Sequence, residues 1–250
     1  MTDEVRDRHA RSFGADMAAY ARARPGYPAA AVDWLLPPGA VDVVDLGAGT
    51  GQLTRSLVEW GLRLTAVDPS ASMRAALSAA LPAVPVLAGS GESIPVPDAR
   101  ADAVLCAQAW HWVDPVAASA EVARVLRPGG VLGLVWNTRD PAGRWGAELD
   151  RLLVPAGSPV AAVAGSGEAT PEVAAPFRLE QGPQIAWTQD VDAAGLVDLI
   201  ASRSYVLVLD EPDRRRVLAD AADLAGRWAA DTDSGRLGID YVTRCWRAVR

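Results

Sequence analysis

The chain has 250 residues, of which 50% are hydrophobic, so it fits one large α/β domain or two small ones with a proper core, and one domain is the simpler prediction. Its formal net charge is −7, from 31 acidic residues against 24 basic ones, all of them arginine because the sequence contains no lysine. An acidic chain without a basic run lacks the electrostatic footprint of nucleic-acid binding, so we expect no nucleic-acid partner. Two cysteines, Cys106 and Cys245, form neither a disulfide framework nor a metal-ligand cluster, and we predict no metal.

The N-terminal region, residues 1–38, is predicted to form a helical cap. It starts with charged residues and has no apolar core of signal-peptide length, and no later stretch is long enough to span a membrane. We therefore expect a cytoplasmic protein without a membrane partner. Residues 17–24 have a helical pattern, the Pro-Gly-Tyr-Pro segment at 25–28 interrupts it, and residues 29–36 are predicted to form the next helix.

A strand, a turn rich in glycine and a helix follow. Residues 41–46 are a short apolar run with the β-branched content of a buried parallel strand, and residues 50–60 have a helix-like pattern. Between them, Gly47, Gly49 and Gly51 lack Cβ atoms where the backbone bends and where a ligand can touch it. We call residues 47–51 the glycine turn and predict that it binds a nucleotide.

Two aspartates indicate which nucleotide the glycine turn accepts. Asp45 ends the strand before the turn, and Asp68 follows a second apolar run, where a carboxylate can accept hydrogen bonds from both ribose hydroxyls. Position 52 is glutamine instead of the third glycine of the dinucleotide fingerprint. The pattern favours a ligand without phosphates at the turn, and an NAD-dependent oxidoreductase is the less favoured alternative.

The segments after Asp68 alternate between helix and strand patterns. Helices are predicted over residues 69–80 and 114–126, and strands over residues 84–88, 102–107 and 131–136. This alternation predicts a parallel sheet with helices on its faces. Ligands of such sheets bind beyond the carboxyl ends of the strands, so the loops after the strands are the candidate site.

The loop after the predicted strand 102–107 carries Trp110, His111 and Trp112. It is expected to face both the nucleotide and a second substrate. The tryptophans offer flat apolar area and cation–π contacts, and the imidazole can take a proton near neutral pH. The alternative is that one tryptophan packs against the following helix and that His111 only orients a backbone carbonyl.

The rest of the chain is predicted to complete the sheet. Residues 144–153 have an amphipathic helical pattern, and residues 154–176 are rich in Ala, Gly, Pro, Ser and Thr with little periodicity. We expect a loop there, either a lid over a substrate or a tolerated insertion. Further elements are predicted in this order: a strand at 177–191, helices at 193–204 and 211–230, and a last strand at 239–249.

Four motifs in order resemble the class I S-adenosylmethionine-dependent methyltransferases, in particular small-molecule methyltransferases of the type 11-like group. The similar segments are residues 45–51 (Asp-Leu-Gly-Ala-Gly-Thr-Gly), 66–70 (Ala-Val-Asp-Pro-Ser), 91–106 and 125–132. The resemblance implies a Rossmann-like doubly wound, mostly parallel seven-stranded sheet with helices on both faces and an antiparallel last strand. It implies a single domain over residues 1–250: a cap (1–38), a cofactor-binding core (39–137), a loop or lid (138–176) and a C-terminal part that completes the sheet (177–250).

The resemblance also implies S-adenosylmethionine as the cofactor and S-adenosylhomocysteine as the product. The residues expected to bind the cofactor are Asp45, Gly47, Ala48, Gly49, Gly51, Asp68, Pro69, Ser90, Gly91, Glu92, Gln108, Arg24 and Tyr20. Ser90 would contact the adenine amino group, with an ordinary turn residue as the alternative. Arg24 or Tyr20 would meet the cofactor carboxylate; the alternatives are a solvated helix-end charge for Arg24 and packing for Tyr20.

We expect methyl transfer to a small-molecule acceptor by in-line displacement. His111 is the candidate catalytic base, and the candidate acceptor contacts are Trp110, Trp112, Trp136 and Arg203. Helix-end packing is the alternative for Arg203. The sequence leaves the acceptor and the methylated atom open, and a homodimer is one option for the oligomeric state. A protein that binds S-adenosylmethionine without catalysis is the alternative function.

Overall fold

The computed structural model describes residues 24–153, 170–203, 206 and 209–249. Tyr20 and residues 154–169 of the predicted loop lie outside these ranges, so their expected roles stay predictions.

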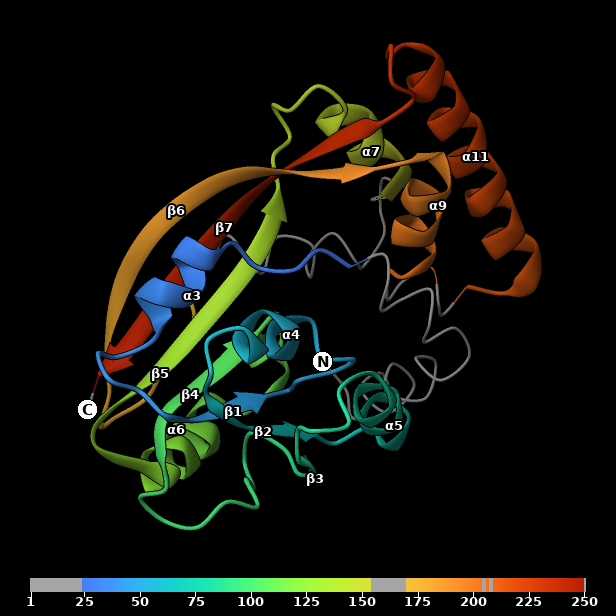
Figure 1. The fold of residues 1–250 in the computed structure, drawn as a ribbon. Helices are drawn as coiled ribbons and strands as arrows, with labels where there is room; N and C mark the ends of the chain where they lie inside the picture. The colour runs from blue at the N-terminus through green and yellow to red at the C-terminus, as the bar shows by residue number, and fades with distance from the viewer. Residues whose placement is uncertain (1–23, 154–169, 204–205, 207–208, 250) are drawn as a thin grey trace. The chain divides into compact units, whose positions relative to one another are not determined.

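The described chain forms a seven-stranded mixed sheet with the order β3-β2-β1-β4-β5-β7-β6 (Figure 1). The strands are β1 (Asp42–Leu46), β2 (Arg63–Asp68), β3 (Val86–Ala88), β4 (Ala101–Ala107), β5 (Leu126–Arg139), β6 (Arg178–Val191) and β7 (Leu237–Val249). The pairs β1/β2, β1/β4, β2/β3 and β4/β5 are parallel. The last strand, β7, runs antiparallel to its neighbours (Figure 1). The predicted fold class is confirmed.

Helices alternate with the strands along the chain, as predicted. They are α3 (Ala29–Leu35), α4 (Gln52–Val58), α5 (Ala71–Ala80), the 3-10 helix η1 (Trp110–Trp112), α6 (Pro115–Val125), α7 (Gly146–Leu153), α9 (Ala193–Ala201) and α11 (Glu211–Ala230). Short polar residues begin several of them. The Asp114 carboxylate accepts from the backbone N–H groups of Val116 and Ala117 at the start of α6, where Pro115 is the first helical residue.

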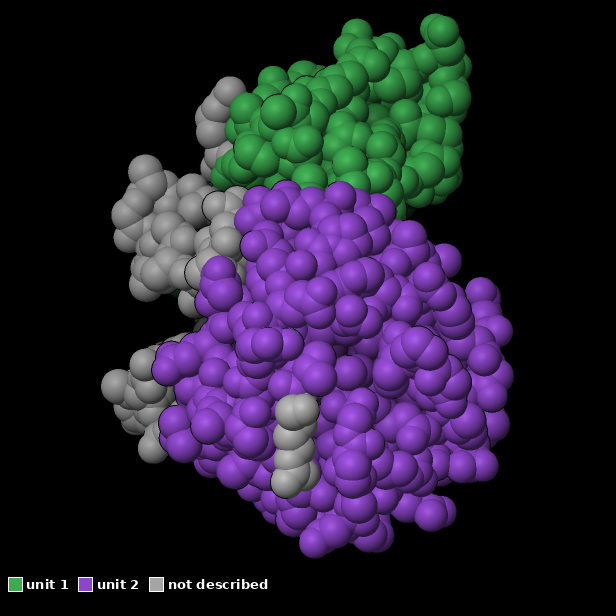
Figure 2. Space-filling model, turned by 90° about the vertical axis from the view of Figure 1, so that its left-hand side faces the viewer, with its two compact units in different colours: residues 1–25, 139–166, 186–242 green, residues 26–138, 167–185, 243–250 purple. Residues whose placement is uncertain are grey.

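The chain divides into two compact units (Figure 2). Unit 1 comprises residues 1–25, 139–166 and 186–242, and its described core is formed by α7, α9, α11 and parts of β6 and β7. Unit 2 comprises residues 26–138, 167–185 and 243–250, and it contains β1 to β4 with their helices. The chain of β5, β6 and β7 passes through both units, and the single domain over residues 1–250 stays a prediction.

Strand β4 of unit 2 is mostly apolar because both of its faces are covered. On β4, Val104 and Cys106 belong to one buried cluster, which also contains residues of α6. Ala103 and Leu105 alternate with them and belong to a second cluster, with residues of α3 and α4. Side chains of a strand point to opposite faces in turn, so a strand covered on both sides reads as a continuous apolar run.

Several predicted boundaries are wrong by a few residues, and two of these differences have a clear physical cause. The helix predicted over 50–60 begins at Gln52, because Gly51 adopts a left-handed conformation with φ 89° and precedes the first helical residue. The strand predicted over 131–136 already begins at Leu126, which pairs with Ala101 across an irregular register. The composition of residues 127–130, Arg-Pro-Gly-Gly, is typical of a turn, and it concealed this extension.

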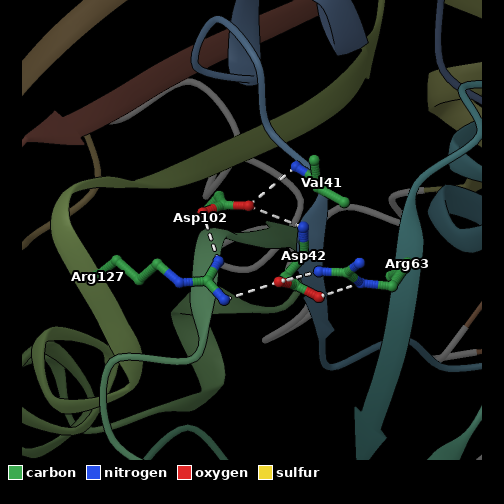
Figure 3. Close-up of polar contacts among 5 residues, drawn as sticks. All are labelled: Val41, Asp42, Arg63, Asp102 and Arg127. Carbon is green, nitrogen blue, oxygen red and sulfur yellow. Dashed lines mark hydrogen bonds and ion pairs between the residues drawn. The ribbon is translucent and has the colours of Figure 1, made fainter.

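The amino ends of four strands are joined by a network of charges (Figure 3). Asp42 on β1 pairs with Arg63 on β2 at 2.7 Å and with Arg127 on β5 at 2.8 Å. Arg127 also pairs with Asp102 on β4 at 2.5 Å, and the Asp102 carboxylate accepts from the backbone N–H groups of Val41 and Asp42. These charged groups pair with one another at the amino ends of the strands, opposite the carboxyl ends where the candidate site lies. The network is therefore structural.

Candidate functional site

The glycine turn connects β1 to α4 with three residues in the left-handed region. Gly47, Gly49 and Gly51 have φ angles of 69°, 56° and 89°, which L-residues with a side chain rarely adopt. The backbone N–H groups of Gly47 and Ala48 both donate to the carbonyl oxygen of Val67, at 2.8 and 3.1 Å. The turn is therefore fixed against the end of β2.

The three glycines have different surroundings. A Cβ atom on Gly47 would lie 2.7 Å from the Cβ atom of Ala109, and one on Gly51 would lie 3.0 Å from Leu77. At Gly49, no atom of the described residues comes within 4 Å of such a Cβ. Gly47 and Gly51 are thus needed for packing, whereas Gly49 borders open space in which a ligand can approach the backbone.

Asp68 holds the glycine turn from the carboxyl end of β2. One carboxylate oxygen accepts from the backbone N–H of Gly49 and the other from that of Ser70, both at 2.8 Å. The side chain is buried, and burial raises the pKa of Asp68, while these two hydrogen bonds and Arg74 oppose the increase. A carboxylate oxygen can accept more than one hydrogen bond, so Asp68 keeps acceptor capacity for hydroxyl groups of a ligand.

Asp45 is fully buried at the end of β1 and has fewer partners. Its Oδ2 accepts a hydrogen bond of 2.5 Å from the hydroxyl of Thr54 on α4. Burial, together with the nearby Asp68 carboxylate, raises the pKa of Asp45 to about 7 against the hydrogen bond from Thr54. The two aspartates that the sequence singled out are therefore neighbours, but their surroundings differ.

Two buried polar atoms, one in the glycine turn and one just before it, have unused hydrogen-bonding capacity. In the described part of the chain, neither Asp45 Oδ1 nor Thr50 Oγ1 has a hydrogen-bond partner. Buried polar groups in native proteins nearly always have partners, and an exception needs an explanation. Together with the open space at Gly49, these atoms fit a ligand with polar groups at the turn.

The loop after β3 follows a strand that pairs with the end of β2. β3 pairs with β2 up to Asp68 and Ala88, and the backbone N–H of Ser90 donates to the carbonyl oxygen of Ser93 within the loop. A Cβ on Gly91 would lie 2.6 Å from a methyl group of Val113. The Glu92 carboxylate accepts from the backbone N–H of Asp114, at 2.8 Å. Glu92 joins the loops after β3 and β4, and contact of this loop with a cofactor stays a prediction.

Gln108 opens the loop after β4 in an unusual conformation. Its φ is 58°, its backbone N–H donates to the carbonyl oxygen of Val135, and its side-chain amide donates to that of Asn137. A left-handed residue other than glycine costs about 1 to 3 kcal/mol and is often found at functional sites. These contacts bring the loop next to the carboxyl half of β5.

Two of the candidate acceptor residues are core residues. Trp110 is 3% exposed and donates from its indole N–H to the carbonyl oxygen of Glu172. Trp136, also 3% exposed, packs edge-on against Trp246 with ring centroids 5.3 Å apart. An acceptor role for these two tryptophans stays a prediction, and the observed packing matches the alternative that a tryptophan of this loop belongs to the core.

His111 and Trp112 lie closer to the surface. Their ring centroids are 4.6 Å apart, His111 is exposed and Trp112 is half-buried. Desolvation by surrounding atoms lowers the pKa of His111 to about 4. Contact of His111 with solvent opposes this decrease in its pKa. With a large or a small decrease, the imidazole is neutral at pH 7 and can accept a proton.

Arg24 and Arg203 lie in unit 1, apart from the residues of the glycine turn in the sequence. Arg24 donates to the carbonyl oxygen of Ser202 at 3.0 Å, which places it next to Arg203 in that unit. Contact of Arg24 with a cofactor and of Arg203 with an acceptor stay predictions.

The sequence and fold match known methyltransferases. The sequence pattern of a methyltransferase domain family matches residues 44–134. The solved structure of an inferred type II methyltransferase from Anaeromyxobacter dehalogenans is 29% identical and superposes with a TM-score of 0.68, covering 90% of this chain and 97% of that one. A protein of Mycobacterium tuberculosis named an uncharacterized methyltransferase is 48% identical over 237 residues, 95% of this chain and 95% of the relative. The chain belongs to the class I S-adenosylmethionine-dependent methyltransferases.

A relative with a specific name covers only part of this methyltransferase. The malonyl-[acyl-carrier protein] O-methyltransferase of Serratia marcescens is 36% identical over 125 residues, which is 46% of this chain and 49% of the relative. In the described residues, no helix is long and apolar enough to cross a membrane. No group of three or more His, Cys, Asp or Glu in the same residues is placed to hold a metal ion.

Three residues of the candidate site were not predicted from the sequence. Thr54 binds Asp45, Ala109 requires glycine at position 47, and Arg74 donates to the carbonyl oxygens of Asp68 and Pro69 at 2.9 Å each. Of these three residues, only Thr54 could have been found from the sequence pattern. It lies between Leu53 and Leu57 on the buried face of α4, where a polar residue needs a partner.

Proposed function

We propose that this methyltransferase binds S-adenosylmethionine at the glycine turn and methylates a small-molecule acceptor placed beside the loop after β4. The observation that carries the proposal is the open backbone at Gly49 between two buried aspartates, with Asp45 Oδ1 and Thr50 Oγ1 unused in the described chain. When bound, S-adenosylmethionine supplies an electrophilic methyl group.

Asp68 is proposed to orient the ribose. Each of its oxygens accepts one backbone N–H, and each keeps capacity for a ligand hydroxyl at the carboxyl end of β2. The same hydrogen bonds fix the Asp68 carboxylate relative to Gly49, so the carboxylate and the glycine turn are held in a fixed geometry before the ligand binds. Preorganisation of this kind reduces the entropy cost of placing a methyl group for in-line displacement.

His111 is proposed to act on the acceptor. Its ring is neutral at pH 7 and exposed, next to the half-buried Trp112, so it can remove a proton from a hydroxyl or amine. Trp112 provides a flat apolar surface for an acceptor. An acceptor that is already anionic, such as a carboxylate, would not need the base, and the partial similarity to an O-methyltransferase suggests including carboxylic acids among the acceptors tested.

Calorimetric titration with S-adenosylmethionine, S-adenosylhomocysteine and NAD, in parallel, tests the cofactor. We expect both adenosyl compounds to bind and NAD not to bind. Incubation with labelled S-adenosylmethionine and a panel of hydroxyl, amine and carboxylate acceptors then tests the reaction. Binding of NAD alone would refute the proposal, and cofactor binding without transfer to any class of acceptor would favour a non-catalytic binding protein.

A further inference from the structure

Two neighbouring carboxyl groups at the glycine turn have unequal hydrogen bonding. Asp68 accepts two backbone N–H groups, and each of them stabilises its ionised form. Asp45 accepts only the Thr54 hydroxyl, and its Oδ1 has no partner in the described chain. Burial is the main cause that raises the pKa of Asp45, and the charge of the Asp68 carboxylate adds to it, so a proton held by the pair resides mainly on Asp45.

We propose that Thr54 is a positioning residue that holds Asp45 as a proton-exchanging group, so that binding of the cationic cofactor at the glycine turn releases a proton from Asp45. This inference rests on the proposed function, because it requires S-adenosylmethionine at the turn. It concerns regulation of that site by pH and not the chemical step.

The groups that face Asp45 support a proton exchange at this residue. Asp68 from β2 is the acidic neighbour, and Arg74 on α5 acts on Asp68. Cys106 on β4 is buried, and burial and the aspartates raise the pKa of its thiol, which therefore stays protonated. From α4, the group that contacts Asp45 is the uncharged hydroxyl of Thr54. Asp45 is thus the group of this cluster that can change its charge near neutral pH.

The direction of the effect follows from the charges. S-adenosylmethionine carries a sulfonium and an ammonium group against one carboxylate, so its net positive charge favours the ionised form of Asp45. The pKa of Asp45, about 7 in the unliganded protein, is lowered on binding. Affinity therefore rises with pH through this range and levels off above it, and we expect binding to be about tenfold weaker at pH 6 than at pH 8.

Calorimetry with S-adenosylmethionine at pH 6, 7 and 8 tests the inference, with each titration repeated in phosphate and in imidazole, which both buffer across this range. The two buffers have different ionisation enthalpies, so the difference in apparent heat counts the protons released. We expect wild type to release a proton near pH 7 and Asp45→Asn to release fewer and to lose most of the pH dependence. The ligand's own amino group titrates equally in both proteins and cancels in this comparison.

Variants of Thr54 separate positioning from a general effect on stability. Thr54→Val loses the hydroxyl donor, so the rise in affinity should move to higher pH, and Thr54→Ser should restore the wild-type profile. Equal affinity at all three pH values in wild type, with no heat difference between buffers, would overturn the inference even if Thr54→Val does not fold. Absence of binding at every pH would instead refute the proposed function, and the inference with it.

Discussion

Asp68 fixes the backbone of the glycine turn and is also the residue proposed to bind the ribose. Its two oxygens hold the backbone at Gly49 and Ser70, and the remaining lone pairs lie where a ribose is proposed. We expect Asp68→Ala to weaken binding of S-adenosylhomocysteine by about 1 to 3 kcal/mol, since ligand hydroxyls lose a charged partner. Titration calorimetry measures this, with Asp98→Ala as the matched control because Asp98 is exposed and pairs with Arg124. Equal affinities of the two variants would remove Asp68 from the site.

His111 is the residue whose role depends most on the acceptor. For an acceptor that must lose a proton, we expect His111→Ala to lower turnover by about 10² to 10⁴-fold without changing cofactor affinity. Because the pKa of His111 is lowered, the imidazole is the neutral base throughout the neutral range, and kcat/KM should fall only below about pH 6. A pH series of initial rates checks both statements, and full turnover in the variant would exclude the histidine from proton transfer.

At the scale of elements, the amino ends of β1, β2, β4 and β5 are held by the charge network around Asp42 (Figure 3). Its arginines hold the pKa of Asp42 well below the usual range. The unfolded chain binds a proton at this residue at higher pH than the folded one, so the stabilisation is present above about pH 4 and is lost as the pH falls.

We therefore expect Asp42→Asn to reduce the free energy of unfolding at pH 7 by about 1 kcal/mol, a modest value because Arg63 and Arg127 are open to solvent. The difference between wild type and Asp42→Asn should shrink as the pH falls from 5 to 2. Urea unfolding at several pH values measures this difference. A constant difference across the series would show that the charge of Asp42 is not responsible.

The elements of unit 2 could be predicted from sequence because strand and helix signals there are local. Apolar runs, the three glycines and the aspartates after β1 and β2 lie in short segments with characteristic composition. Contacts between elements had no comparable signal. The partner of Asp45 is nine positions away on α4, and the burial of Trp110 depends on the carbonyl of Glu172. The sequence pattern around a tryptophan near a candidate site is the same whether its side chain faces a ligand or the core.

At the scale of the whole molecule, the resemblance in the sequence and the similarity of the fold lead to the same family. The four motifs lie in unit 2, whereas unit 1 comprises residues 1–25, 139–166 and 186–242. The family and the cofactor class thus follow from unit 2. The four motifs carry no signal for the acceptor, and for this reason the sequence did not identify it.

The central claim is that the cofactor lies against the backbone of the glycine turn. Gly49→Ala tests it most directly, because Gly49 has a φ of 56° and a new Cβ would enter space without described atoms. Gly39→Ala is the matched control, since Gly39 has a φ of 74°, equally open surroundings in the described chain, and a place outside the site. Both variants should lose about 1 kcal/mol of stability through backbone strain.

The measurement is the dissociation constant of S-adenosylhomocysteine for wild type and both variants, by titration calorimetry at pH 8. We predict that Gly49→Ala binds about tenfold more weakly or worse, because its methyl group occupies ligand space. Gly39→Ala should bind like wild type. Wild-type affinity in Gly49→Ala, with the variant folded, would contradict the account.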